Sequence, residues 1–308
     1  MKRLLLAMLV PAVAFCAGDL DSAVKAKIAG FQGRVSLAAK NLETGESYSL
    51  RADEPVRTAS TIKLAIMIEC FAEANEGKLD LNEKLKVLPE EKVSGSGILQ
   101  EMTDNDLFPI RDMVDLMIVL SDNTATNLIL NRIGGDAVNA RMESLGLKQT
   151  RSMRKILGDR NDLKPYPSGI TKEGAKPENK KWGIGRTTPA EMLFLIEKIY
   201  RGEMVSKSAS EQMLTILKHQ RDRDGIGRDM KDVDIANKTG ALDALRADVG
   251  LIFSKKGPIA MAIYIDGMPE PDWTVDNPGE LLIARLSEIL VDGLGSNSKG
   301  GAATTAAH

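Results

Sequence analysis

Hydrophobic and polar positions alternate near both ends of the chain and follow a helical period between them. Residues 34–39 and 47–50 alternate on either side of a Glu-Thr-Gly-Glu turn, a pattern typical of a β-hairpin. Residues 247–253 and 259–265 are apolar runs separated by a Lys-Lys-Gly-Pro turn. The pattern therefore predicts strands near both termini.

The middle of the chain has the spacing of amphipathic helices. Apolar residues recur every three to four positions, and glycines follow two of the segments. Thr188, followed by Pro189 and Glu191, has the composition of a helix N-terminus with a capping box. Helices are expected at 19–28, 60–76, 107–120, 124–133, 136–145, from 189 onward, and at 280–294.

This order of elements predicts an α/β (α+β) fold, with one antiparallel sheet assembled from both chain termini and flanked by helices. Residues 19–58 together with 207–294 would form a discontinuous α/β domain, and 59–206 an inserted all-helical domain. A polar loop at 155–186 is long enough to suggest a functional role. The tail at 295–308 has too little apolar surface to pack and is predicted to be disordered.

The N-terminus has the composition of a secretory signal peptide, assigned to residues 1–17. A basic region at 1–3 precedes an apolar run at 4–15 that is too short to span a bilayer. We expect a secreted or periplasmic protein with no stable membrane span after cleavage. The bulky Phe15 disfavours a lipoprotein anchored at Cys16.

Composition narrows the function classes. The 308 residues carry a formal net charge of -2, which does not indicate a nucleic-acid-binding protein. The two histidines, His219 and His308, are too few for a zinc site, so neither a metal nor a cofactor is expected. With Cys16 removed, Cys70 has no disulfide partner, and its apolar surroundings predict a buried, inert thiol.

Three short motifs that can carry chemistry occur in order: S-x-x-K at 60–63, S-D-N at 121–123 and K-T-G at 238–240. On a helix, Ser60 and Lys63 would share one face. A serine hydroxyl needs a base to become a nucleophile, and a lysine can be that base when its pKa is lowered. The alternative is that the serine only caps a helix and the lysine lies on the surface.

Together the motifs resemble those of class A β-lactamases and penicillin-binding proteins, over about residues 36–294. The resemblance implies that family's fold, with the active site in a cleft between the two parts. It implies that Ser60 forms an acyl-enzyme and that Lys63 is its base. Ser121 would relay a proton to the leaving nitrogen, and Lys238 would supply positive charge near it.

The resemblance also implies a set of substrate-binding groups. Asn123 would hold the substrate's amide carbonyl, and Thr239 would donate a hydrogen bond to its carboxylate. Gly240 would leave room for substrate along the strand edge, and the backbone N–H of Ala241 would complete an oxyanion hole with that of the nucleophile. Arg246 is a candidate second anchor for the carboxylate; the alternative is a surface salt bridge with the aspartate two residues on.

The chain departs from the family in the long loop. In class A enzymes a loop glutamate activates the water that hydrolyses the acyl-enzyme, and counting on from Arg154 places that position at Ile156. An aspartate that pairs with the arginine is likewise replaced by Gly185. Glu173 and Glu178 are carboxylates in the same loop, although neither lies at the position of the family's glutamate. Both remain candidates for the group that activates the deacylating water.

The sequence therefore predicts a secreted, monomeric active-site-serine hydrolase of class A β-lactamase type, which opens β-lactams through an acyl-enzyme on Ser60. One alternative is a D-alanyl-D-alanine peptidase or an esterase on the same scaffold. Another is a penicillin-binding protein that becomes acylated without efficient deacylation. The fate of the acyl-enzyme distinguishes these readings.

Overall fold

The computed structural model describes residues 17–158 and 169–295. The predicted signal peptide and the predicted C-terminal tail fall almost wholly outside these ranges, as does part of the long loop. Within the two ranges, none of the helices combines the length and the apolar character that a membrane crossing requires.

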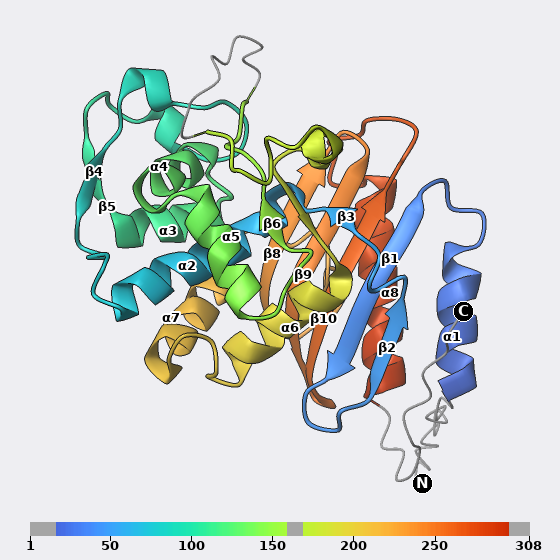
Figure 1. Cartoon of the computed structure of the whole chain (residues 1–308). Coiled ribbons are helices and arrows are strands. Elements are labelled where there is room, and N and C mark those ends of the chain that lie inside the picture. Colours follow the sequence, from blue (N-terminus) through green and yellow to red (C-terminus); the bar gives the residue numbers. More distant parts are fainter. Residues whose placement is uncertain (1–16, 159–168, 296–308) are drawn as a thin grey trace, which may run out of the picture.

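A five-stranded antiparallel sheet joins the two ends of the chain, in the order β2-β1-β10-β9-β8 (Figure 1). N-terminal β1 pairs with C-terminal β10 from Arg34 opposite Asp266 to Asn41 opposite Ile259. The prediction of one sheet built from both termini is therefore confirmed. The strands are β1 (Arg34–Asn41), β2 (Ser47–Leu50), β8 (Asp234–Leu242), β9 (Leu245–Ser254) and β10 (Gly257–Asp266).

Helices cover both faces of this sheet (Figure 1). Because successive strand residues point to opposite faces, β9 contributes Ile252 to one apolar core and Leu251 to the other. The helices α1 (Ala17–Ile28) and α8 (Pro278–Leu294) pack on the first core. The helices α6 (Pro189–Tyr200) and α7 (Lys207–Lys218) pack on the second.

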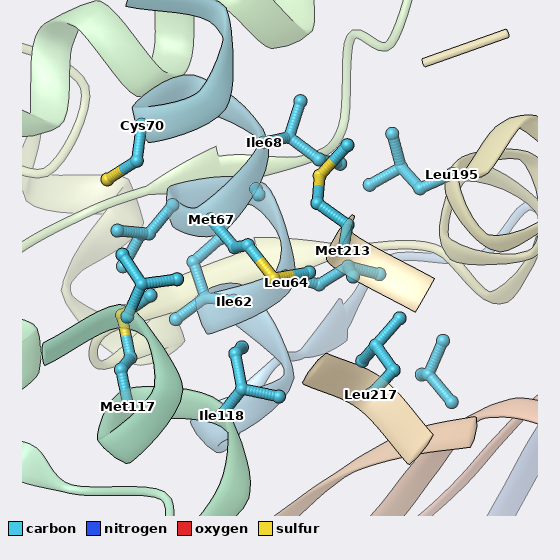
Figure 2. Close-up of a cluster of buried hydrophobic side chains, with 14 of the residues drawn as sticks. Ile62, Leu64, Met67, Ile68, Cys70, Met117, Ile118, Leu195, Met213 and Leu217 are labelled. Carbon is cyan, nitrogen blue, oxygen red and sulfur yellow. The ribbon is translucent and has the colours of Figure 1, made fainter. Parts of the chain in front are cut away.

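The second core continues into the helical region around α2 (Lys63–Asn75), whose first ten residues are all buried. A helix that is apolar on every side must be surrounded by other elements. Figure 2 shows Ile62 and Met67 packed with Met117, Ile118 and Leu217 from neighbouring helices. The surrounding helices include α3 (Ile110–Val119), α4 (Asn123–Ile133) and α5 (Gly135–Ser144).

Cys70 lies in this cluster and is fully buried, as expected (Figure 2). Burial raises the pKa of its thiol, because the thiolate would lose its hydration. The thiol is therefore inert in the folded protein.

Short elements that periodicity did not predict interrupt the helical region. The expected helix at 107–120 begins at Ile110, because residues 107–109 pair with 84–86 as strands. The expected helix at 60–76 begins with a 3-10 turn. These short elements are β3 (Val56–Arg57), η1 (Ala59–Ile62), β4 (Lys84–Lys86), η2 (Pro89–Glu91), η3 (Leu99–Glu101), β5 (Leu107–Pro109), β6 (Arg151–Ser152), η4 (Pro177–Trp182) and β7 (Gly185–Thr187).

Candidate active site

Ser60 lies in the η1 turn that leads into α2, and it is half-buried. The preceding Ala59 has a φ of 44°, in the left-handed region that residues with a Cβ rarely adopt. Such backbone strain is often concentrated at functional sites. Across the described part of the chain, the Ser60 hydroxyl makes no hydrogen bond.

Lys63, at the start of α2, is completely buried and hydrogen-bonded. Its Nζ donates to the carbonyl of Ser121 at 2.7 Å, to the Ser121 Oγ at 3.2 Å and to Asn123 Oδ1 at 2.9 Å. Burial lowers the pKa of Lys63 well below its usual value, the charge of Lys238 lowers it further, and Asp122 opposes the shift. A lowered pKa favours the neutral form of the amine, which can accept a proton.

Lys238, on β8, is the second buried lysine of the site. Its Nζ donates to the Ser121 Oγ at 3.1 Å and to the Thr239 carbonyl at 2.8 Å. Burial lowers its pKa to about 8. The Ser121 hydroxyl thus lies between two lysine amines, and Ser121 itself has a strained φ of 53°. A hydroxyl in this place can pass a proton from one side to the other.

The S-D-N segment also holds the segment at 94–97 in place. Asp122 caps α4 and accepts hydrogen bonds from the N–H groups of Ile98, at 2.7 Å, and Leu99, at 2.8 Å. The Asn123 Nδ2 donates to the Ser94 carbonyl at 3.1 Å. The glycine-rich segment at 94–97 is therefore tied directly to the residues that contact Lys63.

Gly240 brings the K-T-G strand against the nucleophile's turn. A Cβ at this position would lie 2.9 Å from the Thr58 carbonyl oxygen and 3.2 Å from the Ala59 Cβ. The space that the absent side chain leaves is thus filled by the chain's own η1 turn, where the sequence had suggested substrate. This close approach places Ala241, the next residue, beside the turn that carries Ser60. Thr239 is 7% exposed.

Arg246 is 3% exposed and bound to other parts of the protein. Its Nη1 donates to the carbonyls of Leu242, at 2.6 Å, and Leu245, at 2.7 Å, and its Nη2 donates to the Asp272 carbonyl. Its Nε lies 3.4 Å from Glu280 Oε1. The alternative of a surface salt bridge with Asp248 is therefore wrong, because Arg246 is buried and pairs with another acid. Anchoring a substrate carboxylate would require these bonds to be exchanged.

The long loop places Ile156 beside α4. The Asn127 Oδ1 accepts from the Ile156 N–H at 2.9 Å, and the Asn127 Nδ2 donates to the Ile156 carbonyl at 2.8 Å. Asn127 lies one helical turn after Asn123, so this pair of bonds holds the backbone of Ile156 near the site. Its side chain is a hydrocarbon with no proton-accepting group.

The two candidate carboxylates of the loop lie in other surroundings. Glu173 accepts from Lys176 Nζ at 2.6 Å and from Asn179 Nδ2 at 2.7 Å, and the hydrogen bond from Lys176 is the main cause that lowers its pKa. Glu178 is exposed on η4. In the described structure neither side chain contacts the Lys63 and Lys238 amines.

Two acids near Lys238 were not found from the sequence. The charges of Asp222 and Asp248 both raise its pKa against the effect of burial. Asp248 could have been suspected, because it interrupts an otherwise apolar strand. Asp222 gives no such signal, since it lies in a polar, irregular segment.

Comparisons with known proteins agree with this geometry. A model of the β-lactamase enzyme family matches residues 19–294. β-Lactamase AER-1 of Aeromonas hydrophila is 26% identical over 287 residues, which cover 92% of this chain and 88% of the relative. The imipenem-hydrolysing β-lactamase of Enterobacter cloacae is 26% identical over 273 residues, or 86% of each chain.

Solved structures show the same likeness. A β-lactamase from Sphaerobacter thermophilus superposes with a TM-score of 0.77 at 27% identity, covering 91% of this chain and 98% of that one. A leucine-to-glutamate variant of PBP-A, in an acyl-enzyme complex with penicillin G, gives a TM-score of 0.72 at 26% identity over 92% of this chain and 97% of that one. The chain therefore belongs to the β-lactamase enzyme family and is a β-lactamase-like serine hydrolase.

Proposed function

We propose that this protein opens β-lactam rings through a covalent acyl-enzyme on Ser60. Lys63, whose pKa is lowered by burial, takes in its neutral form the proton of the Ser60 hydroxyl as the oxygen attacks the lactam carbonyl. The carbonyl carbon–nitrogen bond then breaks, and Ser121 delivers a proton to the leaving nitrogen. Lys238 stabilises the negative charge that passes through this region.

Substrate binding in this proposal uses the groups around the two lysines. Asn123 receives the substrate's amide, and Thr239 receives its carboxylate. The backbone N–H groups of Ser60 and Ala241 bind the oxyanion, which the close packing of Gly240 on the η1 turn supports. Arg246 would be a second carboxylate anchor only after giving up its bonds to backbone carbonyls.

One observation carries the proposal: the buried chain of contacts from Lys63 through the Ser121 hydroxyl to Lys238, at 3.2 Å and 3.1 Å. Burying two lysine amines is costly, because each loses the hydration of its charged form. A structural role could be filled by apolar side chains at lower cost. The arrangement is explained if Lys63 acts as a base and Lys238 supplies positive charge.

A second candidate function concerns the end of the cycle. Counting on from Arg154, Ile156 falls at the loop position where class A enzymes carry the water-activating glutamate. The similar PBP-A variant forms an acyl-enzyme complex with penicillin G. With no carboxylate at this position, we propose that the acyl-enzyme forms readily and hydrolyses slowly. The protein would then be a penicillin-binding protein whose natural substrate is an acyl-D-alanyl-D-alanine peptide or an ester.

Intact-protein mass spectrometry after mixing with benzylpenicillin tests both candidates. An adduct that vanishes while hydrolysed drug accumulates supports a β-lactamase, with Glu173 or Glu178 as candidates for the deacylating group. A persistent adduct supports a penicillin-binding protein. Ser60→Ala is the control, and labelling that survives this change would refute the assignment of the nucleophile.

We further propose that the protein is secreted or periplasmic and monomeric. The basic and apolar composition of residues 1–15 supports export, although these residues lie outside the described structure. N-terminal sequencing of the exported protein would test this, and a mature chain beginning at Met1 would contradict cleavage. Size-exclusion chromatography with light scattering would test the monomer.

A further inference from the structure

Trp273 lies on the loop between β10 and α8, and its ring packs on the guanidinium of Arg246. The Arg246 Cζ lies 4.7 Å from the centre of the ring, which is the geometry of a cation–π contact. Tryptophan is highly buried on average, yet 65% of Trp273 is exposed, more than any other large apolar side chain that the structure describes. Arg246 therefore covers only part of the ring, and the rest is open to solvent.

The guanidinium beneath the ring is itself held by four other groups. Its Nη1 donates to the carbonyls of Leu242, at 2.6 Å, and Leu245, at 2.7 Å, and its Nη2 donates to the Asp272 carbonyl. Its Nε lies 3.4 Å from Glu280 Oε1. A guanidinium bound in this way cannot swing away from the ring without losing several charge-assisted hydrogen bonds. The ring therefore rests on a fixed support.

The loop that carries the ring is fixed on both sides of the tryptophan. The Asp272 carbonyl accepts from Asn277 Nδ2 at 2.6 Å, and the Asp272 Oδ1 accepts from the N–H and the hydroxyl of Thr274, at 2.8 and 2.7 Å. Asn277 is completely buried and caps α8. Both neighbours of the tryptophan are thus tied down, so an apolar ligand would meet a ring that is already in place.

Strand register relates this support to the site. Arg246 on β9 lies opposite Ala241 on β8, near the end of the sheet where β10 leads into the loop (Figure 1). Thr239 comes two residues before Ala241, so its side chain points to the same face of the sheet as that of Arg246. Thr239 is the group that receives the substrate's carboxylate in the proposed function. The support of the ring and the carboxylate position therefore share one face of the sheet.

We propose that Trp273 is a specificity-determining residue, whose exposed ring contacts an apolar or aromatic group on the carbon next to the substrate's carboxylate. The inference rests on the proposed function, because it uses the same acyl-enzyme and the same carboxylate position. It goes beyond that function by naming a substrate class, namely acyl compounds whose carboxylate-bearing carbon carries an apolar side chain. Arg246 then supports the ring, and its bonds to backbone carbonyls need not be exchanged.

Three thioesters with the same benzoylglycyl acyl group test the proposal. They differ at the carboxylate-bearing carbon of the thiol leaving group, which carries a hydrogen, a methyl or a benzyl group. In the wild type we expect kcat/KM for the benzyl compound to exceed that for the hydrogen compound by about three- to ten-fold, the range of one added aromatic contact. Trp273→Ala should abolish this preference and leave the hydrogen compound within about two-fold, whereas Trp273→Phe should keep most of it.

A merely structural role of the ring gives a different result. If Trp273 only shields Arg246, Trp273→Ala should lower kcat/KM equally for all three thioesters, and this outcome overturns the inference. A wild type that shows no preference, or that hydrolyses none of the thioesters, overturns it as well. Thermal unfolding checks that each variant folds.

Val275→Ala is the matched control. Val275 is a second exposed apolar side chain on the same loop, and its carbonyl accepts a hydrogen bond from Arg228, on the other side of the loop's attachment to Arg246. The preference of this variant should match that of the wild type. An equal loss of preference in Val275→Ala and Trp273→Ala would assign the effect to the loop as a whole and refute the role of the ring.

Benzylpenicillin separates this inference from the proposed function. If it fails to label Ser60 while the thioesters are hydrolysed with the expected preference, the proposed opening of β-lactams is wrong and the role of Trp273 stands. If it labels Ser60 and the thioesters show no preference, the proposed function stands and the role of Trp273 is refuted.

Tryptophan fluorescence gives a readout that needs no turnover. The chain has two tryptophans, so Trp182→Phe leaves Trp273 as the single source of tryptophan emission. 2-Mercapto-3-phenylpropanoate, the leaving group of the benzyl thioester, should change this emission saturably. Thioglycolate, the leaving group of the hydrogen compound, corrects for collisional quenching by the thiol. Equal and unsaturable quenching by both compounds would contradict a contact with the ring.

Discussion

The cluster around Lys63 and the loop around Ile156 both adjoin α4, yet they are built in different ways. In the cluster, each side chain touches the next: Lys63 Nζ lies 3.2 Å from the Ser121 hydroxyl, which lies 3.1 Å from Lys238 Nζ. In the loop, the contacts are made by backbone. Asn127 binds the N–H and the carbonyl of Ile156 and is indifferent to its side chain.

The difference shows how a protein can retain the groups for acylation while it loses a group for deacylation. A cluster of interlocking side chains loses its function with any one member, because each buried polar group needs its partners. A position held through its backbone can change side chain while the fold stays intact. The chain can thus keep the chemistry of acylation while its loop lacks the usual group for deacylation.

Lys63→Met should give the largest effect, because it removes the base and keeps most of the length of the side chain. We expect acylation by a chromogenic cephalosporin to slow by about a thousand-fold, the range of general base catalysis. Stopped-flow absorbance would measure this rate. Lys40→Met, which removes a lysine paired with Glu197 away from the site, is the control. A loss below ten-fold at Lys63 would mean that another base operates.

Ile156→Glu should convert the loop position from a hydrocarbon to a base. If the acyl-enzyme of the wild type persists, the variant should release hydrolysed penicillin about ten- to a hundred-fold faster, while acylation stays similar. The decay of the adduct in the mass spectrum gives the rate. Ile170→Glu places the same charge on an exposed position of the loop and should leave the decay unchanged. If both variants accelerate adduct decay equally, the effect does not depend on a carboxylate at position 156.

The pH dependence should reveal the separate roles of the two lysines. Acylation needs Lys63 neutral and Lys238 charged, so it should fall at low pH and again above about pH 8, where Lys238 loses its proton. At pH 9 the loss should be about ten-fold. Lys238→Arg keeps a charge at all these pH values, so its profile should lack the alkaline fall. If the acylation rate of this variant still falls at alkaline pH, a group other than Lys238 causes the fall.

Asn127→Ala should give the smallest effect on chemistry and a measurable effect on stability. Loss of the two bonds to Ile156 leaves partly buried backbone groups unpaired, which costs about 1–3 kcal/mol. Acylation should change by less than about three-fold, since the lysine contacts remain. Thermal and urea unfolding would measure the loss, and the exposed Asn131→Ala on the same helix provides the control. A large loss of acylation would show that the loop and the cluster are coupled.

The sequence predicted the sheet well because its strands have a clear apolar pattern and its motifs carry chemistry by residue type. It could not predict that η1 precedes α2, because the left-handed φ of Ala59 depends on the strand that packs against it. It placed the helix at 107–120 three residues too early, because the pairing of 107–109 with 84–86 is long-range. Local periodicity holds no information about such contacts.

The site shows the same limit. The residue types of the three motifs were enough to suggest which side chains meet, and the roles assigned to them stay predictions. The orientation of Arg246 was not predictable, because it follows from the carbonyls of the 242–245 turn and from Glu280 on a distant helix. Asp222 was missed for a similar reason, since only the fold brings its charge to bear on Lys238.

The burial of Cys70 has a practical consequence. Its thiol lies inside the cluster that supports α2 and therefore the nucleophile's turn (Figure 2). A water-soluble thiol reagent can reach it only when this cluster opens. The rate of modification therefore measures how often the cluster opens. The rate of Cys70 modification therefore reports local opening of the core beneath the active site. It can be measured in the wild-type protein and in every variant above.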